Sequence, residues 1–233
     1  MIKAEMVADS INQQGDRLIS VLCTFPRIIL AEVNTHRMLS KNTSSSRAIP
    51  FNKMVEAVQN NPFIPIAWQS KHSGMQGSEY LTGSSEIKLL ENKWLEARDL
   101  AVQQAKLLEN SNVTKQLCNR LLEPFMWTTM LITGSEEGWD NFFNLRCPQY
   151  QDIYTKDKYY KSWKIYLQHI EDYQTLNYAK NLNVVGKLQE NKGQAEIHMM
   201  ALAESIYDAV NESTPKQLEA GEWHIPMIEV IEY

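Results

Sequence analysis

The distribution of apolar and polar residues predicts most of the regular elements of this chain. Residues 17–25 (RLISVLCTF) are rich in apolar and β-branched side chains and follow the turn-prone QQGD, a pattern that predicts a strand. Pro26 suits the first turn of a helix, and apolar positions at helical spacing extend that helix to Leu39. The hydroxyl and amide side chains of residues 40–50 (SKNTSSSRAIP) compete for backbone hydrogen bonds, so we expect a polar loop there.

Helical periodicity recurs farther along the chain. The predicted helices cover residues 85–109, 113–122, 135–146 and 194–211. Pro124 ends the second of these helices, and Ser135 starts the third. Residues 126–133 (MWTTMLIT) fit either a strand or a buried helical segment, and the alternating residues 227–233 (MIEVIEY) fit a short strand. Residues 61–84 contain several prolines and glycines. The segment is longer than a loop that merely connects two elements, which indicates a functional flap or a mobile loop.

Strands are few, helices are several, and no regular strand–helix–strand alternation is visible, so the pattern favours an α+β fold.

We expect a single domain over residues 1–233, with an insertion at about 147–192. This insertion holds seven of the ten tyrosines, with seven lysines among them. One interpretation is a surface on which nucleotide bases stack. We favour an amphipathic helical insertion whose tyrosines pack inward and whose lysines face water, because acidic residues are mixed in.

Composition narrows the possible functions. The formal net charge is −5, which disfavours non-specific binding to duplex nucleic acid. No apolar run is long enough for a membrane span, and the N-terminus lacks a signal-peptide pattern, so we expect a soluble cytoplasmic protein. The three cysteines are too scattered for a disulfide framework, and the five histidines lack metal-ligand spacing. We therefore assign no metal site.

The remaining chemistry is concentrated in arginines. The chain has no glycine-rich phosphate loop and no Gly-x-Ser-x-Gly nucleophile motif. Arg37 and Arg47 instead lie in a polar stretch, and Arg120 and Arg146 follow downstream. The planar guanidinium suits phosphates and the carbonyl or imide edge of a base. Although a single arginine is more often a solvated ion pair, this set suggests an anionic ligand.

The spacing of that polar stretch is informative. His36-Arg37-x-x-Ser40-x-Asn42-x-x-Ser45-x-Arg47 resembles the Arg-His-Arg-x-x-Ser-x-Asn-x-x-Ser-x-Arg signature of the flavin-dependent thymidylate synthases at six of seven positions. Downstream, Arg120 with Pro124, NFFNLR (141–146) and QAEIHMMALA (194–203) are similar to further motifs of that family and occur in the same order. Together these motifs extend over most of the chain.

The resemblance implies a mixed β-sheet flanked by helices, a homotetramer with sites between subunits, and two sets of ligand contacts. FAD would be bound at the positions of Thr35, His36, Arg37, Thr43 and Asn141. The nucleotide dUMP would be bound by Glu32, Ser45, Ser46, Arg47, Arg120 and Arg146. In the family, NADPH reduces the flavin and methylenetetrahydrofolate supplies the carbon, so that dUMP is methylated to dTMP.

Arg146 is the catalytic candidate. C5 of uracil is a weak nucleophile, and the resemblance places Arg146 at the ring, where its charge would stabilise the enolate that forms as C5 attacks. No cysteine lies in the signature, and we interpret Cys147 as an ordinary buried thiol.

Several positions depart from the family pattern. Thr35 replaces the first arginine, Glu32 replaces a glutamine, Thr43 replaces a glutamate, and the upstream His-x-Thr element is missing. The chain therefore resembles a divergent member of the family, of the type expected in a bacteriophage. Two alternatives stay open: a related enzyme that modifies C5 of dUMP or dCMP, for example by hydroxymethylation, and a nucleotide-binding protein without catalysis.

Overall fold

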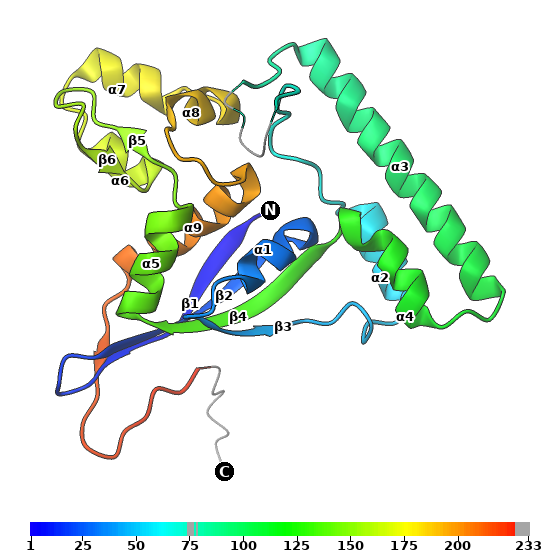
Figure 1. The fold of residues 1–233 in the computed structure, drawn as a ribbon, viewed down its shortest axis with the longest axis horizontal. Coiled ribbons are helices and arrows are strands. Elements are labelled where there is room, and N and C mark those ends of the chain that lie inside the picture. Colours follow the sequence, from blue (N-terminus) through cyan, green and yellow to red (C-terminus); the bar gives the residue numbers. More distant parts are fainter. Residues whose placement is uncertain (74–76, 78, 227–233) are drawn as a thin grey trace.

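The computed structural model describes residues 1–73, 77 and 79–226 and centres on a five-stranded mixed sheet. Its strands are β1 (Lys3–Ile11), β2 (Arg17–Pro26), β3 (Ser40–Thr43), β4 (Trp127–Ser135) and β7 (Lys216–Gln217). They lie in the order β3-β4-β2-β1-β7, and every pair is antiparallel except the parallel pair β1–β7 (Figure 1). The predicted α+β class, with a mixed sheet flanked by helices, is confirmed.

The strand predicted over residues 17–25 is confirmed as β2. Ile19, Val21, Cys23 and Phe25 alternate along it and are fully buried on one face of the sheet. Residues 126–133 prove to be strand, since they form most of β4. Sequence analysis missed β1, whose register with β2 shifts at Met6/Ala8 and so disrupts the alternation expected of a strand.

Three helices cover the apolar face of the sheet: α1 (Leu30–Asn34), α5 (Glu136–Arg146) and α9 (Ile197–Glu212). The predicted helices at 135–146 and 194–211 are thereby confirmed. Ser135 caps α5 by accepting a hydrogen bond from the Gly138 N–H, as the sequence predicted. Trp139, Phe142 and Met199 from these helices pack on the sheet residues in the largest apolar cluster.

The helix predicted from Pro26 to Leu39 is wrong in length. A 3₁₀ turn (η1, Arg27–Ile29) and the short α1 are followed by turns, and the Thr35 hydroxyl donates to the Glu32 carbonyl at 2.6 Å. This side-chain bond competes with continuation of the helix. The expected polar loop at residues 40–50 is also partly wrong, because its first four residues form the edge strand β3 against β4.

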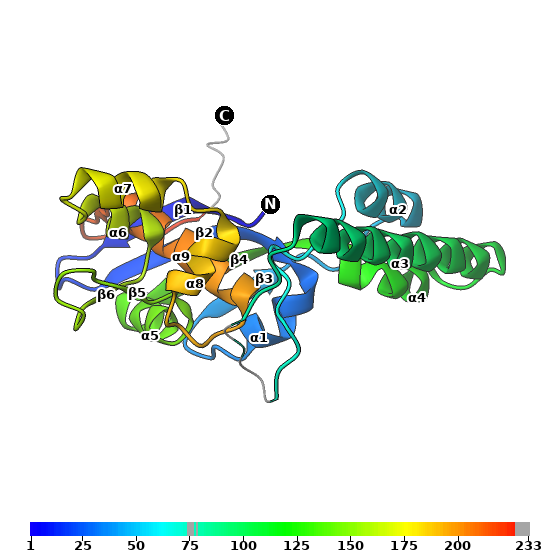
Figure 2. The same ribbon diagram turned by 90° about the horizontal axis from the view of Figure 1, so that it is seen from above.

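A second layer of helices extends beside the sheet (Figure 2). It comprises α2 (Phe51–Asn60), α3 (Ser84–Asn110), α4 (Lys115–Cys118) and the 3₁₀ helix η2 (Asn119–Phe125), which share their own apolar cluster. The long helix predicted at 85–109 is confirmed as α3, whereas α2 was missed. The helix predicted at 113–122 is instead α4 plus η2, and Pro124 lies inside η2 rather than ending it. Within the described residues, no helix has the length and apolarity needed to cross a bilayer.

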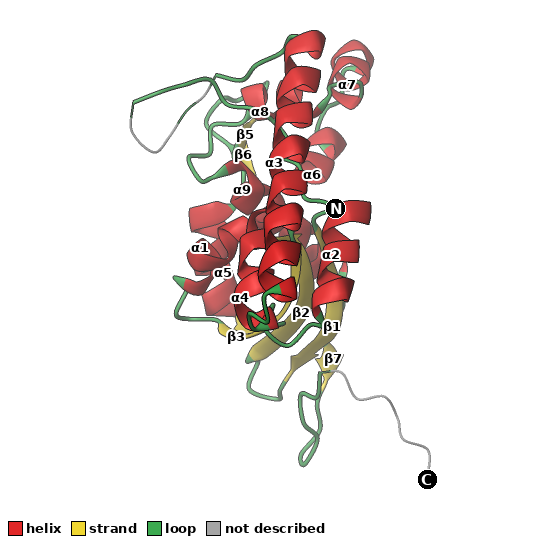
Figure 3. Ribbon diagram, turned by 90° about the vertical axis from the view of Figure 1, so that its right-hand side faces the viewer, coloured by secondary structure: helices red, strands yellow, loops and turns green. Residues whose placement is uncertain are grey.

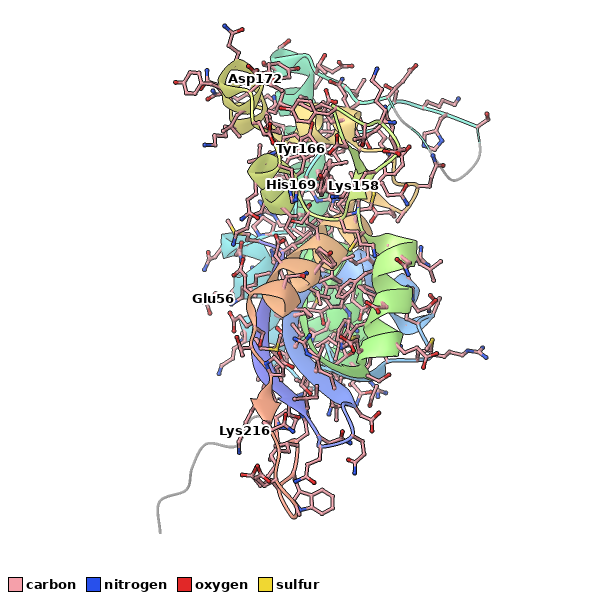
Figure 4. The ribbon with its side chains drawn as sticks, turned by 90° about the vertical axis from the view of Figure 1, so that its left-hand side faces the viewer. Glu56, Lys158, Tyr166, His169, Asp172 and Lys216 are labelled. Atoms are coloured by element: carbon pink, nitrogen blue, oxygen red, sulfur yellow. The ribbon has the colours of Figure 1, made fainter. Side chains whose placement is uncertain are left out.

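The insertion forms a small unit with its own apolar cluster. It contains β5 (Tyr150–Gln151), β6 (Tyr159–Tyr160), α6 (Trp163–Gln168), α7 (Tyr173–Lys180) and α8 (Val184–Glu190). Its helices lie at the end of the molecule far from β7 (Figures 1 and 3). Tyr150, Tyr160 and Tyr166 pack inward, with Lys158 over the Tyr160 ring near His169 (Figure 4). The other four tyrosines of the insertion are exposed, so inward packing holds for three of the seven.

Glu204 joins the insertion to α9. Its carboxylate accepts hydrogen bonds from the Trp163 N–H at 2.5 Å and from the Tyr150 hydroxyl at 3.3 Å. Burial, aided by the nearby Asp208, raises the pKa of Glu204 from 4.5 to about 7, although the two hydrogen bonds and Lys187 act in the opposite direction. The contact between the insertion and α9 therefore contains a carboxyl group that titrates near neutral pH.

The packing of the insertion against α9 is expected to become less stable as the pH rises. Because the pKa of Glu204 is raised in the folded state, its stabilising contribution is complete below pH 4.5 and is lost as the pH rises through about 7. Amide hydrogen exchange in residues 150–168, corrected for intrinsic rates, should be faster at about pH 8 than at about pH 6. Glu204→Gln, which stays neutral, should remove most of this difference. A pH dependence that persists in Glu204→Gln would show that another group is responsible.

The loop over residues 61–84 is firmly held at its start. Phe63 is fully buried, and its N–H donates to the Phe125 carbonyl at 2.9 Å. The Trp94 indole N–H in turn donates to the Phe63 carbonyl at 2.7 Å. Farther along, Gln69 and Tyr80 form an isolated antiparallel bridge. Whether the segment acts as a flap stays a prediction, and the strand predicted at 227–233 lies outside the described residues.

Candidate active site

His36 and Arg146 meet where α1 and α5 end. Arg146 is the last residue of α5, and its Nε donates to Nε2 of His36 at 2.9 Å. His36 is 7% exposed and meets Phe142 edge to face. Burial, followed by the charges of Arg146 and Lys41, lowers the pKa of His36 to about 4. The imidazole is therefore neutral near pH 7 and accepts the hydrogen bond that Arg146 donates.

Carboxylates lie close to this pair. Burial raises the pKa of Glu32, and the charge of Glu196 raises it further, while Arg146 and His198 act to lower it. Glu196 caps α9 by accepting hydrogen bonds from the backbone N–H groups of His198 and Met199. The site therefore combines Arg146 with two acidic side chains in a partly buried setting, where electrostatic interactions are stronger than in water.

His198 fixes the start of the 61–84 loop against this cluster. Its Nδ1 lies 2.5 Å from Oε1 of Glu196, and its Nε2 accepts from the Ile66 N–H at 3.1 Å. A cavity of about 400 Å³ borders Glu196 and Tyr80, with one wall supplied by insertion residues 188–192. Loop, insertion and α9 thus meet beside the Arg146 cluster.

A second polar cluster surrounds Ser46 at the start of the helical layer. Ser46 is buried, and its hydroxyl donates to Glu123 at 2.7 Å. Glu123 also lies 3.2 Å from Arg27 and 3.6 Å from Arg120. Arg120, Ser45 and Arg47 are exposed. The predicted phosphate-binding residues are thus gathered around one loop, and Glu123 balances part of their positive charge.

Asn119 anchors that loop. Its side chain is fully buried and donates to the Ser46 carbonyl at 2.8 Å and to the Ile49 carbonyl at 3.0 Å. These bonds hold the segment that carries Arg47. Buried carbonyls that lose their donors destabilise the folded state.

Asn119→Ala is expected to lower the free energy of unfolding by about 2–4 kcal/mol, because two buried carbonyls lose their donor. Nucleotide affinity should fall as well, since the loop that carries Arg47 loses its anchor. Urea unfolding and titration with dUMP measure the two effects. Asn92→Ala, on the exposed side of α3, is the matched control and should change neither. Unchanged stability in Asn119→Ala would rule out the anchoring role.

The positions assigned to FAD have different surroundings. Thr35, Arg37 and Asn141 are exposed, and Thr43 is half-buried in β3. Arg37 directly follows His36 in the chain, and Asn141 lies on α5, the helix that ends at Arg146. Among the described residues, no hydrogen bond or ion pair joins this cluster to the one around Ser46. The polar contacts of one chain therefore do not link the two groups of predicted site residues.

Sequence analysis missed several polar residues that organise these clusters. Lys41 donates to the His36 carbonyl, and Asn119, Glu123 and His198 hold loops in place. Glu196 and His198 had a signal, because both lie in the recognised QAEIHMMALA segment. Cys147 is confirmed as an ordinary buried thiol: it is 4% exposed, and burial raises its pKa well above the usual value, so it stays protonated.

Solved structures with a similar fold include two of the UMP/dUMP methylase PolB from Streptomyces cacaoi. The structure bound with 5-Br dUMP has a TM-score of 0.61 at 12% identity, over 91% of this chain and 90% of that chain. The structure bound with 5-Br UMP has a TM-score of 0.53 at 16% identity, over 68% and 82%. At these identities the likeness shows a shared fold. The sequence matches no family profile and no curated protein.

Proposed function

We propose that this protein is a flavin-dependent thymidylate synthase that methylates dUMP at C5 to give dTMP. The observation that carries the proposal is the Arg146 guanidinium, held through Nε by the neutral His36. Its two terminal nitrogens make no hydrogen bond to the described residues, so they are available to a ligand. The signature spacing and the fold shared with a UMP/dUMP methylase support the same substrate class.

In the proposed mechanism, the residues around Ser46 orient the substrate and Arg146 activates it. Arg47 and Arg120 would bind the phosphate, with Ser45 donating a shorter hydrogen bond. Ser46, whose hydroxyl already donates to Glu123, would support the loop that carries Arg47. Arg146 would donate to the uracil carbonyl and stabilise the negative charge that develops as C5 attacks the carbon donor. Arg146 keeps its own charge throughout, so no proton needs to leave it. The protonated Cys147 takes no part.

The residues proposed for FAD fit a phosphate-bearing cofactor. Arg37, next to His36 in the chain, and Asn141, on α5, are exposed donors, which is the donor chemistry that a diphosphate and a ring carbonyl need. Thr35 supplies no cation, and its hydroxyl already donates to the Glu32 carbonyl, so phosphate binding falls mainly to Arg37. When bound, the flavin would supply the hydride that completes the methyl group, with NADPH as reductant and methylenetetrahydrofolate as carbon donor.

Assembly into a homotetramer forms part of the proposal. Among the described residues of one chain, no polar contact links the Ser46 and Arg146 clusters, and a site between subunits would bring the first cluster of one copy to the second cluster of another. Light scattering coupled to size-exclusion chromatography tests this assembly. A monomer that turns over dUMP would contradict it.

Glu32 and Glu196 favour a second candidate, a related enzyme that hydroxymethylates C5 of dUMP or dCMP. Carboxylates beside a base can accept from the exocyclic amine of cytosine as readily as from the ring N–H of uracil. The Glu32 carboxyl replaces the usual family glutamine, so base preference is the property most open to change.

A product assay discriminates these candidates. The protein would be incubated with FAD, NADPH and methylenetetrahydrofolate, once with dUMP and once with dCMP, and the nucleotides analysed by mass spectrometry. We expect a methylated product from dUMP alone. A product heavier by one oxygen atom, or one formed from dCMP, would favour the second candidate. Binding of dUMP without any product would point to a nucleotide-binding protein.

A further inference from the structure

We propose that His36 is a positioning residue, which fixes the orientation of the Arg146 guanidinium through Nε. The inference rests on the proposed function, in which Arg146 faces the pyrimidine. The resemblance assigned His36 to the flavin. The observed contact is instead with Arg146, across 2.9 Å from Nε to Nε2.

His36 is built as a rigid, neutral acceptor. Its N–H bonds the Val33 carbonyl at 3.3 Å, its carbonyl accepts from the Lys41 ammonium, and its ring packs edge to face on Phe142. The residue is 7% exposed, and its burial together with the charges of Arg146 and Lys41 keeps the ring unprotonated near neutral pH. Because Nε2 accepts from Arg146, the ring proton belongs on Nδ1. The acceptor therefore has a fixed position as well as a fixed charge.

Anchoring through Nε has a geometric consequence. A guanidinium presents three edges, and using Nε for His36 leaves the pair of terminal nitrogens as a planar fork toward a ligand. An unanchored arginine side chain has several rotatable bonds whose ordering opposes binding. The anchor removes much of that cost before the substrate arrives.

The anchor also separates Arg146 from Glu32. Glu32 lies near enough for Arg146 to lower its pKa, yet no hydrogen bond between the two is formed. Without His36, the nearest carboxylate would attract the guanidinium and compete with the substrate for it. His36 thus holds a charged group in an orientation that its electrostatic surroundings alone would not select.

Two variants of nearly equal chemistry test this geometry. In His36→Gln the side-chain amide reaches the position of Nε2, whereas in His36→Asn it reaches only the position of Nδ1. We expect His36→Gln to keep most of the kcat and His36→Asn to lose about 10- to 100-fold, the usual effect of removing a hydrogen bond to a charged group. The KM for dUMP should change little, since the phosphate contacts lie elsewhere.

A double-mutant cycle separates positioning from a flavin contact. Arg146→Lys removes the Nε donor, so His36→Asn should cost little more in that background. An equal loss from His36→Asn in both backgrounds would overturn the proposal. It would indicate that His36 instead contacts the flavin, as the resemblance implied. If the wild-type protein forms no product, the proposed function fails by itself, and the Nε–H exchange of Arg146 in the wild type and the His36 variants still tests this inference without turnover.

A spectroscopic measurement needs neither turnover nor ligand. The Nε–H signal of Arg146, assigned by its absence in Arg146→Lys, should exchange slowly with water in the wild type and in His36→Gln. It should exchange rapidly in His36→Asn. Equal exchange in all three proteins that carry Arg146 would show that Nε is not held by His36 and would reject the proposal.

Discussion

Arg146→Ala is expected to lower the rate of C5 modification at least about a hundredfold while leaving the fold intact. Arg146 ends α5 and is only partly buried, so its removal leaves the apolar cluster of the sheet unchanged. Loss of one preorganised donor to a developing oxyanion costs about 10²–10³ in rate. The effect should fall on kcat more than on KM, because the charge on the pyrimidine develops only as the reaction proceeds.

Lys93→Ala is the control for loss of a positive charge. Lys93 is exposed on α3 and pairs only with Glu96, so its variant should keep wild-type turnover and stability. Single-turnover kinetics and thermal unfolding of both variants provide the comparison. Turnover in Arg146→Ala near that of Lys93→Ala would exclude Arg146 as the group that activates the pyrimidine, and unfolding of the variant would assign Arg146 a structural role.

Sequence periodicity predicted the elements whose apolar residues face one continuous surface. The helices α3 and α9 were found because burial on one face imposes a regular repeat. The strand β2 was found from its apolar and β-branched residues, and α5 from the capping Ser135. The bulge at Met6/Ala8 hid β1, and the polar edge strand β3 has no apolar repeat to detect. Its stability comes from backbone pairing with β4, a tertiary contact that no local pattern records.

The candidate site was predicted as a set of residue types rather than as a geometry. The signature placed His36 among the site residues, and the NFFNLR motif placed Arg146 there, but their mutual hydrogen bond joins positions 110 residues apart. The roles of Glu123 and Asn119 were invisible because an isolated acidic or amide side chain has many possible partners on a chain of this length. The structure supplies these partners, and whether the assigned residues bind their proposed ligands stays a prediction.

Trp139→Ala is expected to lower the free energy of unfolding by about 3–5 kcal/mol, the largest stability change among our predictions. Trp139 is 1% exposed, stacks on Phe143 with ring centroids 5.8 Å apart, and donates its indole N–H to the Ile19 carbonyl at 3.2 Å. The substitution opens a cavity between α5 and the sheet and also leaves a buried acceptor without its donor. Urea unfolding followed by circular dichroism measures the change.

Trp223→Ala provides the matched comparison, because Trp223 is 78% exposed and its truncation should shift stability by no more than about 0.5 kcal/mol. Similar unfolding midpoints for the two variants would contradict the placement of Trp139 in the core.

A change in function should accompany the loss of stability in Trp139→Ala. Since α5 carries Arg146 at its end, a loosened α5 should weaken both dUMP affinity and turnover, whereas His36→Asn should reduce turnover without lowering stability to the same extent. The two variants thus separate the packing that supports Arg146 from the hydrogen bond that orients it.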